Sequence, residues 1–136
     1  MAKTNIIPRG IRNNNPLNIR IGNVWLGEVA KPNDPVFEQF CTLEYGLRAA
    51  FVILRRYIRR YGHNTIRSIV STWAPSSENN TKAYIEHVCA HMKMDADAPI
   101  KYEDKDTMCR LVSAMILVEC GQKVDEAKIA KAYSMA

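Results

Sequence analysis

The chain has 136 residues, a net charge of +5 at pH 7 and a hydrophobic fraction of 47%. This length fits one domain, which buries roughly two thirds of its unfolded surface and needs no disulfide to hold its core. No apolar run reaches the roughly 18 residues of a transmembrane helix, so we expect no membrane insertion. The N-terminal sequence MAKTNIIPRG lacks the apolar centre of a signal peptide, and we expect synthesis in the cytoplasm.

The cysteines and histidines predict neither a disulfide framework nor a metal site. The cysteines have apolar neighbours and no CxxC spacing, which is typical of small buried side chains in a reducing compartment. They are Cys41, Cys89, Cys109 and Cys120. His87 and His91 stand four residues apart and could share a metal on one helix face, but a third ligand of matching spacing is missing. We therefore expect no metal and no cofactor.

Much of the positive charge lies in one run of arginines with tyrosines between them. The run comprises Arg48, Arg55, Arg56, Arg59, Arg60 and Arg67, with Tyr57 and Tyr61. Such a pattern suits an anionic partner, either nucleic acid or the anionic bacterial cell wall, and it equally suits a solvated helix face with no partner. Of the two partners, we expect the cell wall and not nucleic acid.

Residues 1–41, the N-terminal lobe, read as irregular with short strands. Proline or glycine interrupts this segment every few residues, and an asparagine triplet precedes Pro16. Alternation typical of strands appears only over residues 19–21, 24–26 and 36–40. Because the lobe has little core of its own, we expect Trp25, Phe37 and Phe40 to anchor it against the rest of the chain.

Residues 42–136 read as helical, which makes the whole chain one mainly α domain with a small loop-rich lobe. Apolar stripes at helical spacing are followed by residues that cap or end helices. The expected helices are Thr42 to Gly62, Asn64 to Pro75, one after the loop 76–80, one from Asp104 or Asp106 to Gly121, and one near Asp125 to Tyr133.

One carboxylate stands where an apolar stripe would continue. The stripe consists of Met108, Leu111, Val112, Met115 and Ile116, and its next position is Glu119. A carboxylate that faces a core or a cleft keeps its proton to higher pH than a surface carboxylate, which suits a general acid. The alternatives are a structural partner of an arginine and a helix-end carboxylate that reaches water.

Several segments resemble small phage and prophage virion-associated proteins. They are RGIRNNNPLNIR, Trp25 with Gly27, Phe37 with Phe40, the sequence Gly46-Leu47-Arg48-Ala49, and WAPSSENNTKAYIEHV. Together they cover most of the chain. This resemblance implies a protein that belongs to a phage particle or to a delivery system derived from one.

The chain also resembles the lysozyme-like superfamily, above all the soluble lytic transglycosylases, in circularly permuted order. In that family a helix that ends in Glu, a small residue and Gly comes first, and the sequence Glu119-Cys120-Gly121 resembles its end. The later family elements resemble Asn13–Ile19, the helix Gly46–Tyr61, and Glu78, Thr81, Tyr84 and Ile85. Termini often lie close together at a protein surface, so permutation is physically permissible.

The resemblance implies cleavage of peptidoglycan glycan strands, with Glu119 as the catalytic acid. A lysozyme-type second carboxylate would come from Glu28, Asp34, Glu38 or Glu44. Lytic transglycosylases use a single acid and form an anhydro sugar, and we favour this slightly over hydrolysis. A Cys-His peptidase fails on geometry, because Cys41 and His63 flank a helix of roughly 25 Å.

The candidate substrate-binding residues are aromatic or polar, since sugar faces stack on aromatics and sugar hydroxyls and acetamides need hydrogen-bonding groups. They are Asn13, Asn14, Asn18, Trp25, Trp73, Glu78, Asn79, Thr81 and Tyr84, with Asn80 as a further hydrogen-bonding candidate. For the aromatics the alternative is a place in the core. For the asparagines it is turn formation and helix capping, and for Glu78 it is stabilisation of a helix N-terminus.

The expected site of action is the periplasm or cell wall, reached after lysis, through a secretion machine or as part of a virion. Expected partners are peptidoglycan strands, components of a particle or secretion machine, and an inhibitory immunity protein. The competing prediction is a non-catalytic phage structural or adaptor protein that binds cell wall, nucleic acid or another protein.

Overall fold

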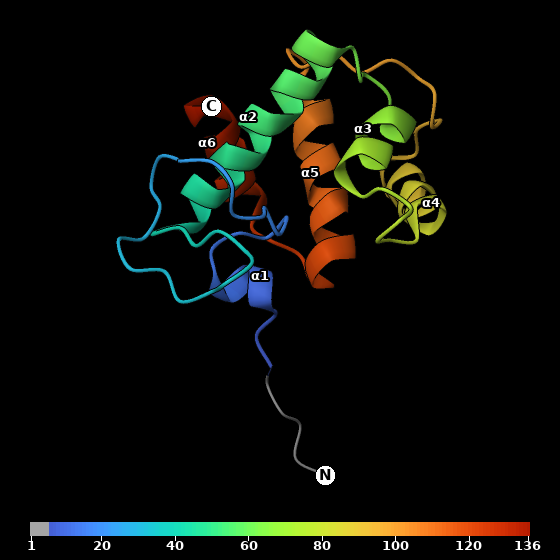
Figure 1. Ribbon diagram of the computed structural model, residues 1–136. Coiled ribbons are helices and arrows are strands. Elements are labelled where there is room, and N and C mark those ends of the chain that lie inside the picture. Colours follow the sequence, from blue (N-terminus) through green and yellow to red (C-terminus); the bar gives the residue numbers. More distant parts are fainter. Residues whose placement is uncertain (1–5) are drawn as a thin grey trace.

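The computed structural model describes residues 6–136, a range that contains six α-helices and no regular strand (Figure 1). The helices are α1 (Arg9–Arg12), α2 (Leu43–Tyr61), α3 (Ile66–Trp73), α4 (Thr81–Met92), α5 (Lys105–Cys120) and α6 (Glu126–Met135). The prediction of a mainly α protein is confirmed. None of the described helices is long and apolar enough to cross a membrane. Residues 1–5, on which the signal-peptide expectation partly rests, lie outside the described residues.

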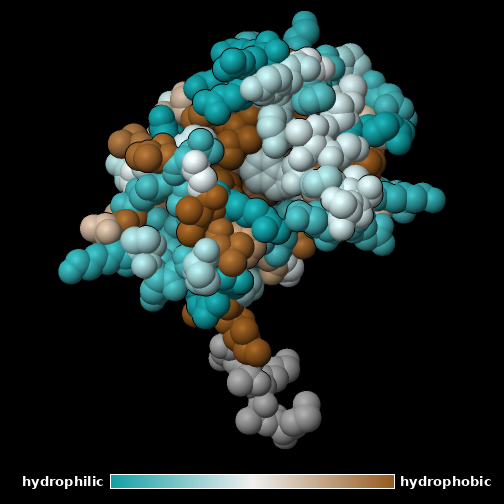
Figure 2. Space-filling model, in the orientation of Figure 1, coloured by the Kyte–Doolittle hydropathy of each residue, from teal (hydrophilic) through white to brown (hydrophobic). Residues whose placement is uncertain are grey.

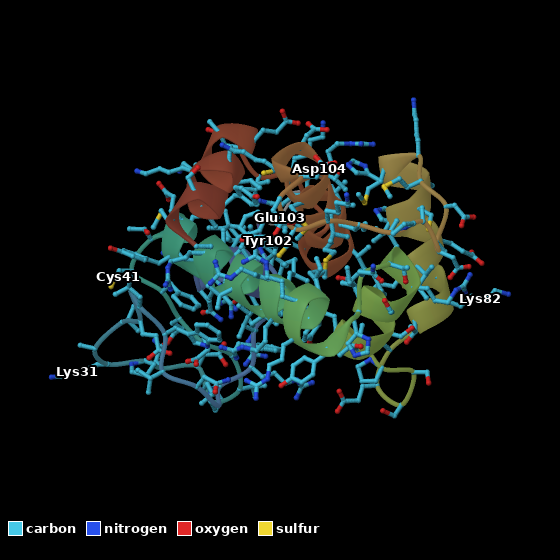
Figure 3. All side chains as sticks on the ribbon, turned by 90° about the horizontal axis from the view of Figure 1, so that it is seen from above. Lys31, Cys41, Lys82, Tyr102, Glu103 and Asp104 are labelled. Atoms are coloured by element: carbon cyan, nitrogen blue, oxygen red, sulfur yellow. The ribbon has the colours of Figure 1, made fainter. Side chains whose placement is uncertain are left out.

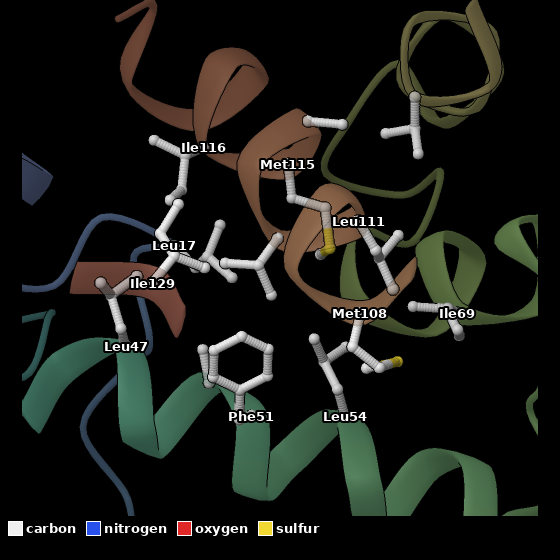
Figure 4. Packing of buried hydrophobic residues seen from close by; sticks show 14 of the residues in the cluster. Leu17, Leu47, Phe51, Leu54, Ile69, Met108, Leu111, Met115, Ile116 and Ile129 are labelled. Atoms are coloured by element: carbon white, nitrogen blue, oxygen red, sulfur yellow. The ribbon is translucent and has the colours of Figure 1, made fainter. Parts of the chain in front are cut away.

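Helix α5 runs through the middle of the core, with α2 and α6 on one side of it and α3 and α4 on the other (Figure 1). Figure 4 shows the packing of its apolar face against side chains from α2, α3, α6 and the N-terminal lobe. These buried side chains include Leu17, Leu47, Phe51, Leu54, Ile69, Met108, Leu111, Met115, Ile116 and Ile129. The stripe predicted to lead to Glu119 is therefore the inner face of the central helix.

The helix ends follow from their capping residues. The Thr42 hydroxyl accepts a hydrogen bond from the Tyr45 N–H, and Gly62 ends α2 in the left-handed region at φ 72°, as predicted. Asp104 and Asp125 cap α5 and α6. The prediction for α3 is corrected by one residue, because the Thr65 side chain caps it through a reciprocal capping box with Ser68.

The N-terminal lobe is held by side-chain amides and by scattered backbone hydrogen bonds, without a regular sheet among its described residues. The predicted strand pieces reduce to two isolated bridges, Arg20 with Phe37 and Glu28 with Phe40. The buried Asn15 side chain donates to the Ile19 and Glu38 carbonyls, at 2.9 and 3.0 Å, and accepts from the Ile19 N–H. The same segments are also joined by backbone hydrogen bonds, from the Glu38 N–H to the Ile19 carbonyl and from the Ile21 N–H to the Val36 carbonyl, both at 2.9 Å. The Asn15 amide adds to these bonds between residues 19 and 38.

The three aromatic residues predicted to anchor the lobe differ in how far they are buried. Phe40 is fully buried, and Trp25 packs at the edge of the core. Phe37 is half-buried, with the guanidinium groups of Arg9 and Arg20 over its ring at 4.7 and 5.8 Å.

Much of the arginine run has partners within the chain. Arg55 and Arg59 lie over the Tyr102 ring, at 5.6 and 5.1 Å from its centroid, and Arg59 also pairs with Glu103. Arg67 and Asp97 form two hydrogen bonds. These contacts hold the connection 93–103 against α2 and α3, a role that needs no anionic partner.

Replacement of Gly46 by alanine should destabilise the whole protein. Gly46 lies where α2 meets the asparagine triplet, and a Cβ there would stand 1.8 Å from the Asn14 carbonyl oxygen. The backbones of α2 and of the asparagine triplet are both held in place by packing, so neither can move to relieve this clash. We therefore expect the free energy of unfolding, measured by urea denaturation, to fall by at least about 3 kcal/mol. A Gly22→Ala control has no neighbour within 4 Å and should change stability little. Equal stability of the two variants would contradict this packing.

Candidate active site

Glu119 lies in the last turn of α5, where three distant parts of the chain meet. The helix ends at Cys120, and Gly121 follows in the left-handed region at φ 70°. The Asn18 side chain donates to Glu119 Oε1 at 3.0 Å, and the Tyr84 hydroxyl donates to Oε2 at 3.1 Å. The carboxylate is thus held between the N-terminal lobe and the first turn of α4.

Burial is the main influence on the Glu119 carboxyl, and it raises its pKa. The hydrogen bonds from Asn18 and Tyr84, with a weaker one from Trp73, act in the opposite direction, but the pKa stays above its ordinary value. Burial and the neighbouring carboxylate raise the pKa of the Tyr84 hydroxyl far above its ordinary value. Tyr84 therefore remains a donor, while Glu119 can hold a proton and release it.

Glu119 opens onto a groove of about 430 Å³. One wall comes from the start of α4 and the preceding loop, and the other from the last two turns of α5. The lining residues are Asn79, Asn80, Ala83, Tyr84, His87, Leu117, Val118 and Glu119. A sheltered acid beside an accessible groove can reach a ligand that it could not reach from a closed core.

The structure brings several of the predicted site residues together. Asn18, Trp73 and Tyr84 contact or approach the Glu119 carboxylate, and Asn79 lines the groove. Asn80 lines it as well, and its side chain caps α4 by accepting from the Ala83 N–H at 3.1 Å. His87 lies in the groove but was not among the predicted site residues. The sequence signal that could have revealed it is its position one helical turn after Tyr84, which places both side chains on the same face of α4.

Glu78 and Thr81 lie at the two ends of the loop that forms the rim of the groove. Glu78 is exposed and faces Arg20 of the N-terminal lobe, with 3.7 Å between Nη2 and Oε2. The Thr81 hydroxyl donates to the Ala74 carbonyl and closes the loop between α3 and α4. In this structure both side chains contact other protein groups.

Three other predicted residues lie within the N-terminal lobe and contact it. The buried Asn13 amide donates to Asp34 at 2.9 Å, and the Asn14 amide donates to the Phe40 carbonyl at 3.0 Å. The backbone N–H of Trp25 donates to Glu28 Oε1 at 3.1 Å. Asn13, Asn14 and Trp25 thus have structural partners and are absent from the groove lining.

The candidate second carboxylates have different surroundings. Arg9 binds Asp34, with 2.7 Å between Nε and Oδ2, and holds its pKa far below the usual range. Glu38 is 7% exposed, and burial together with the neighbouring Glu28 raises its pKa to about 7. Glu44 lies in the first turn of α2. None of the four lines the Glu119 groove.

The Glu38 carboxyl should make stability depend on pH. Because its folded pKa is raised, protonated Glu38 stabilises the fold fully below the unfolded pKa, near 4.5, and this contribution is lost as pH rises through about 7. Glu38→Gln stays neutral, so the variant should gain roughly 1–3 kcal/mol over wild type between pH 5 and pH 8. Thermal unfolding across that range measures the difference.

Asp34→Asn is the control with the opposite sign. The pKa of Asp34 is depressed, so its contribution is present above the unfolded pKa of about 4 and is lost as pH falls. Asp34→Asn should therefore be less stable than wild type at pH 7, with the deficit shrinking in acid. Parallel pH profiles for the two variants would refute at least one of the two assignments, and a flat profile identifies which.

Removal of the Tyr84 hydroxyl should raise the pKa of Glu119 further, because the hydrogen bond that it donates lowers that pKa. We therefore expect a higher Glu119 pKa in Tyr84→Phe than in wild type, and NMR titration of the Glu119 carboxyl carbon measures it. Asn79→Ala changes the same groove without removing a contact to the carboxylate and serves as the control. An unchanged pKa in Tyr84→Phe would show that the hydroxyl does not stabilise the charged form.

Comparison with known proteins shows that the chain has a phage relative. No model of a known protein family matches the sequence. Protein P5 of Pseudoalteromonas phage PM2 is 40% identical over 124 residues, which cover 88% of this chain and 76% of the phage protein. The predicted resemblance to phage proteins is confirmed at this level. The chain belongs to the same family as protein P5 of Pseudoalteromonas phage PM2.

Proposed function

We propose that this protein cleaves the glycan strands of peptidoglycan in a lysozyme-like site, with Glu119 as its single catalytic acid and base. The observation that carries the proposal is the Glu119 carboxyl itself, which is sheltered, has a raised pKa and lies at the edge of a groove. Its described partners Asn18, Tyr84 and Trp73 are neutral donors, as expected for a group that must both hold and release a proton.

The reaction begins with protonated Glu119. Its proton passes to the glycosidic oxygen as the bond between that oxygen and the anomeric carbon breaks, which leaves an oxocarbenium-like sugar. The Glu119 carboxylate, stabilised by Asn18 and Tyr84, then takes a proton from the hydroxyl that attacks this carbon. Attack by water completes hydrolysis, and attack by the sugar's own hydroxyl gives an anhydro product.

The placement of the other carboxylates supports the single-acid route of lytic transglycosylases. Asp34 is neutralised by Arg9, and Glu38 is buried beside Glu28. The substrate's own hydroxyl removes the need for a second carboxylate. Tyr84 lines the groove and Trp73 lies near the Glu119 carboxylate, while Asn79 provides an amide for sugar hydroxyls.

A phage protein with this activity would open the cell wall, either as part of the particle or during lysis. Membership in the P5 family supports a phage context, and the reaction itself is our proposal.

A non-catalytic structural or adaptor role is the second candidate, favoured by exposed aliphatic side chains on the N-terminal lobe. Ile21, Val24 and Leu26 are exposed, Val24 by 94%, and Figure 2 shows hydrophobic surface over this half of the molecule. Exposed apolar patches mark contact surfaces for other macromolecules.

Purified cell walls separate the two candidates. Wild type should release soluble fragments, and Glu119→Gln should lower the rate about 10²–10⁴-fold, because general acid catalysis is lost while the shape of the site is kept. Glu86→Gln, on the exposed side of α4, is the matched control and should cleave as wild type does. Mass spectrometry of the fragments identifies reducing or anhydro ends. Intact walls after treatment with folded wild-type protein would refute the enzyme proposal and favour the adaptor role.

A further inference from the structure

A second and larger groove lies between α4, α5 and α6, the helices that stand side by side in Figure 3. Its volume is about 720 Å³. The lining residues are His91, Lys105, Asp106, Cys109, Arg110, Ser113, Glu126, Ile129 and Ala130. The function proposed above uses none of them.

Helical spacing places the two grooves in line along α4 and α5. On α4, His91 of the larger groove follows His87 of the Glu119 groove by one turn, and their rings are parallel within 4° with centroids 6.4 Å apart. On α5, Ser113 of the larger groove precedes Leu117 of the Glu119 groove by one turn. Each helix therefore presents one face to both grooves.

The helices run in opposite directions along this surface. Tyr84 at the start of α4 contacts Glu119 at the end of α5, while Arg110 near the start of α5 donates to the Met92 carbonyl at the end of α4. Along α5, the distance from Asp106 to Glu119 corresponds to roughly 20 Å at 1.5 Å per residue. A surface of this length suits a linear polymer better than a small molecule.

The chemistry of the larger groove fits a polar polymer with few charges. Lys105 and Arg110 are balanced by Asp106 and Glu126, and Ile129 adds apolar surface. Two carboxylates in the lining oppose a polyphosphate backbone, which needs a net positive groove. Sugar hydroxyls and acetamides can pair with donors and acceptors of both kinds while their apolar faces rest on aliphatic groups.

We propose that the groove between α4, α5 and α6 binds the glycan strand beyond the cleaved bond, so that one continuous surface from Glu119 to α6 holds several successive sugars. This inference rests on the proposed function for the identity of the polymer. It adds that the protein prefers long strands, and that residues far from Glu119 determine this preference.

Binding to a catalytically silent protein tests the proposal separately from catalysis. Calorimetry on Glu119→Gln, with a GlcNAc-MurNAc disaccharide and with a peptide-free strand of about eight sugars, should show at least tenfold tighter binding of the longer ligand. Ser113→Arg added to Glu119→Gln places a long side chain in the larger groove and should weaken binding of the long strand about tenfold. Ala130→Arg places an arginine on the α6 wall of the same groove and should weaken binding of the long strand in the same way. It replaces Ser113→Arg in the test if that variant does not fold.

The matched control is Ser71→Arg in the same background, because Ser71 lies in a different groove, between α3 and α4. It should bind both ligands as Glu119→Gln does. Equal affinity for the two ligands, or long-strand binding that survives the blocking substitutions, would overturn the inference. Length-dependent binding that Ser113→Arg abolishes would support it even if wild type failed to cleave walls, a result that would refute only the proposed reaction.

Discussion

The contact between Asn18 and Glu119 depends on close approach of backbones that are far apart in the sequence. A hydrogen bond to a charged group contributes about 1.5–3 kcal/mol, too little to position a lobe without a core of its own. Two glycines allow the approach. Gly10 lies where a Cβ would be 2.8 Å from Asn18 Oδ1 and 2.9 Å from Cys120 Sγ, and Gly46 lets α2 meet the asparagine triplet. Side chains at these positions would push Asn18 and the end of α5 apart. The site therefore requires glycine, which has no Cβ, at both positions.

The asparagine triplet shows why the lobe needs no sheet. Asn13 binds Asp34 and Gln39, Asn14 reaches the Phe40 carbonyl, and Asn15 joins two segments through its buried amide. Asn14 also adopts the left-handed region at φ 52°, which asparagine tolerates better than most residues. Each of the three side chains is thereby engaged within the lobe, which leaves it less free to contact a ligand. Among the described residues of this lobe, Asn18 is the one whose side chain bonds to Glu119.

Local sequence signals predicted the parts of the fold that depend on neighbours along the chain. The caps Thr42 and Gly62 and the stripe leading to Glu119 are properties of single helices, and periodicity reveals them. Asn64 and Thr65 both suit an N-cap, and only the reciprocal bonds with Ser68 distinguish them. The four-residue helix α1 is too short for periodicity to reveal. The groove between α4, α5 and α6 could not be predicted, because no pattern within one helix states which helix stands beside it.

The surroundings of Glu119 argue against a purely structural carboxylate. A buried charge that only stabilises a fold is ordinarily paired with a cation, because the desolvation cost must be offset. Within residues 6–136 Glu119 forms no salt bridge, and its hydrogen-bond donors are an amide and a hydroxyl, with a weaker contact to Trp73. Neutral donors compensate the charged form only in part, so burial keeps the Glu119 pKa above its ordinary value. An arginine in place of Asn18 would stabilise both the carboxylate and the fold. It would also lower the pKa of Glu119 and so disfavour the protonated form. The chain carries instead neutral donors around a carboxyl at the edge of an open groove, which is the arrangement that the proposed proton transfer requires.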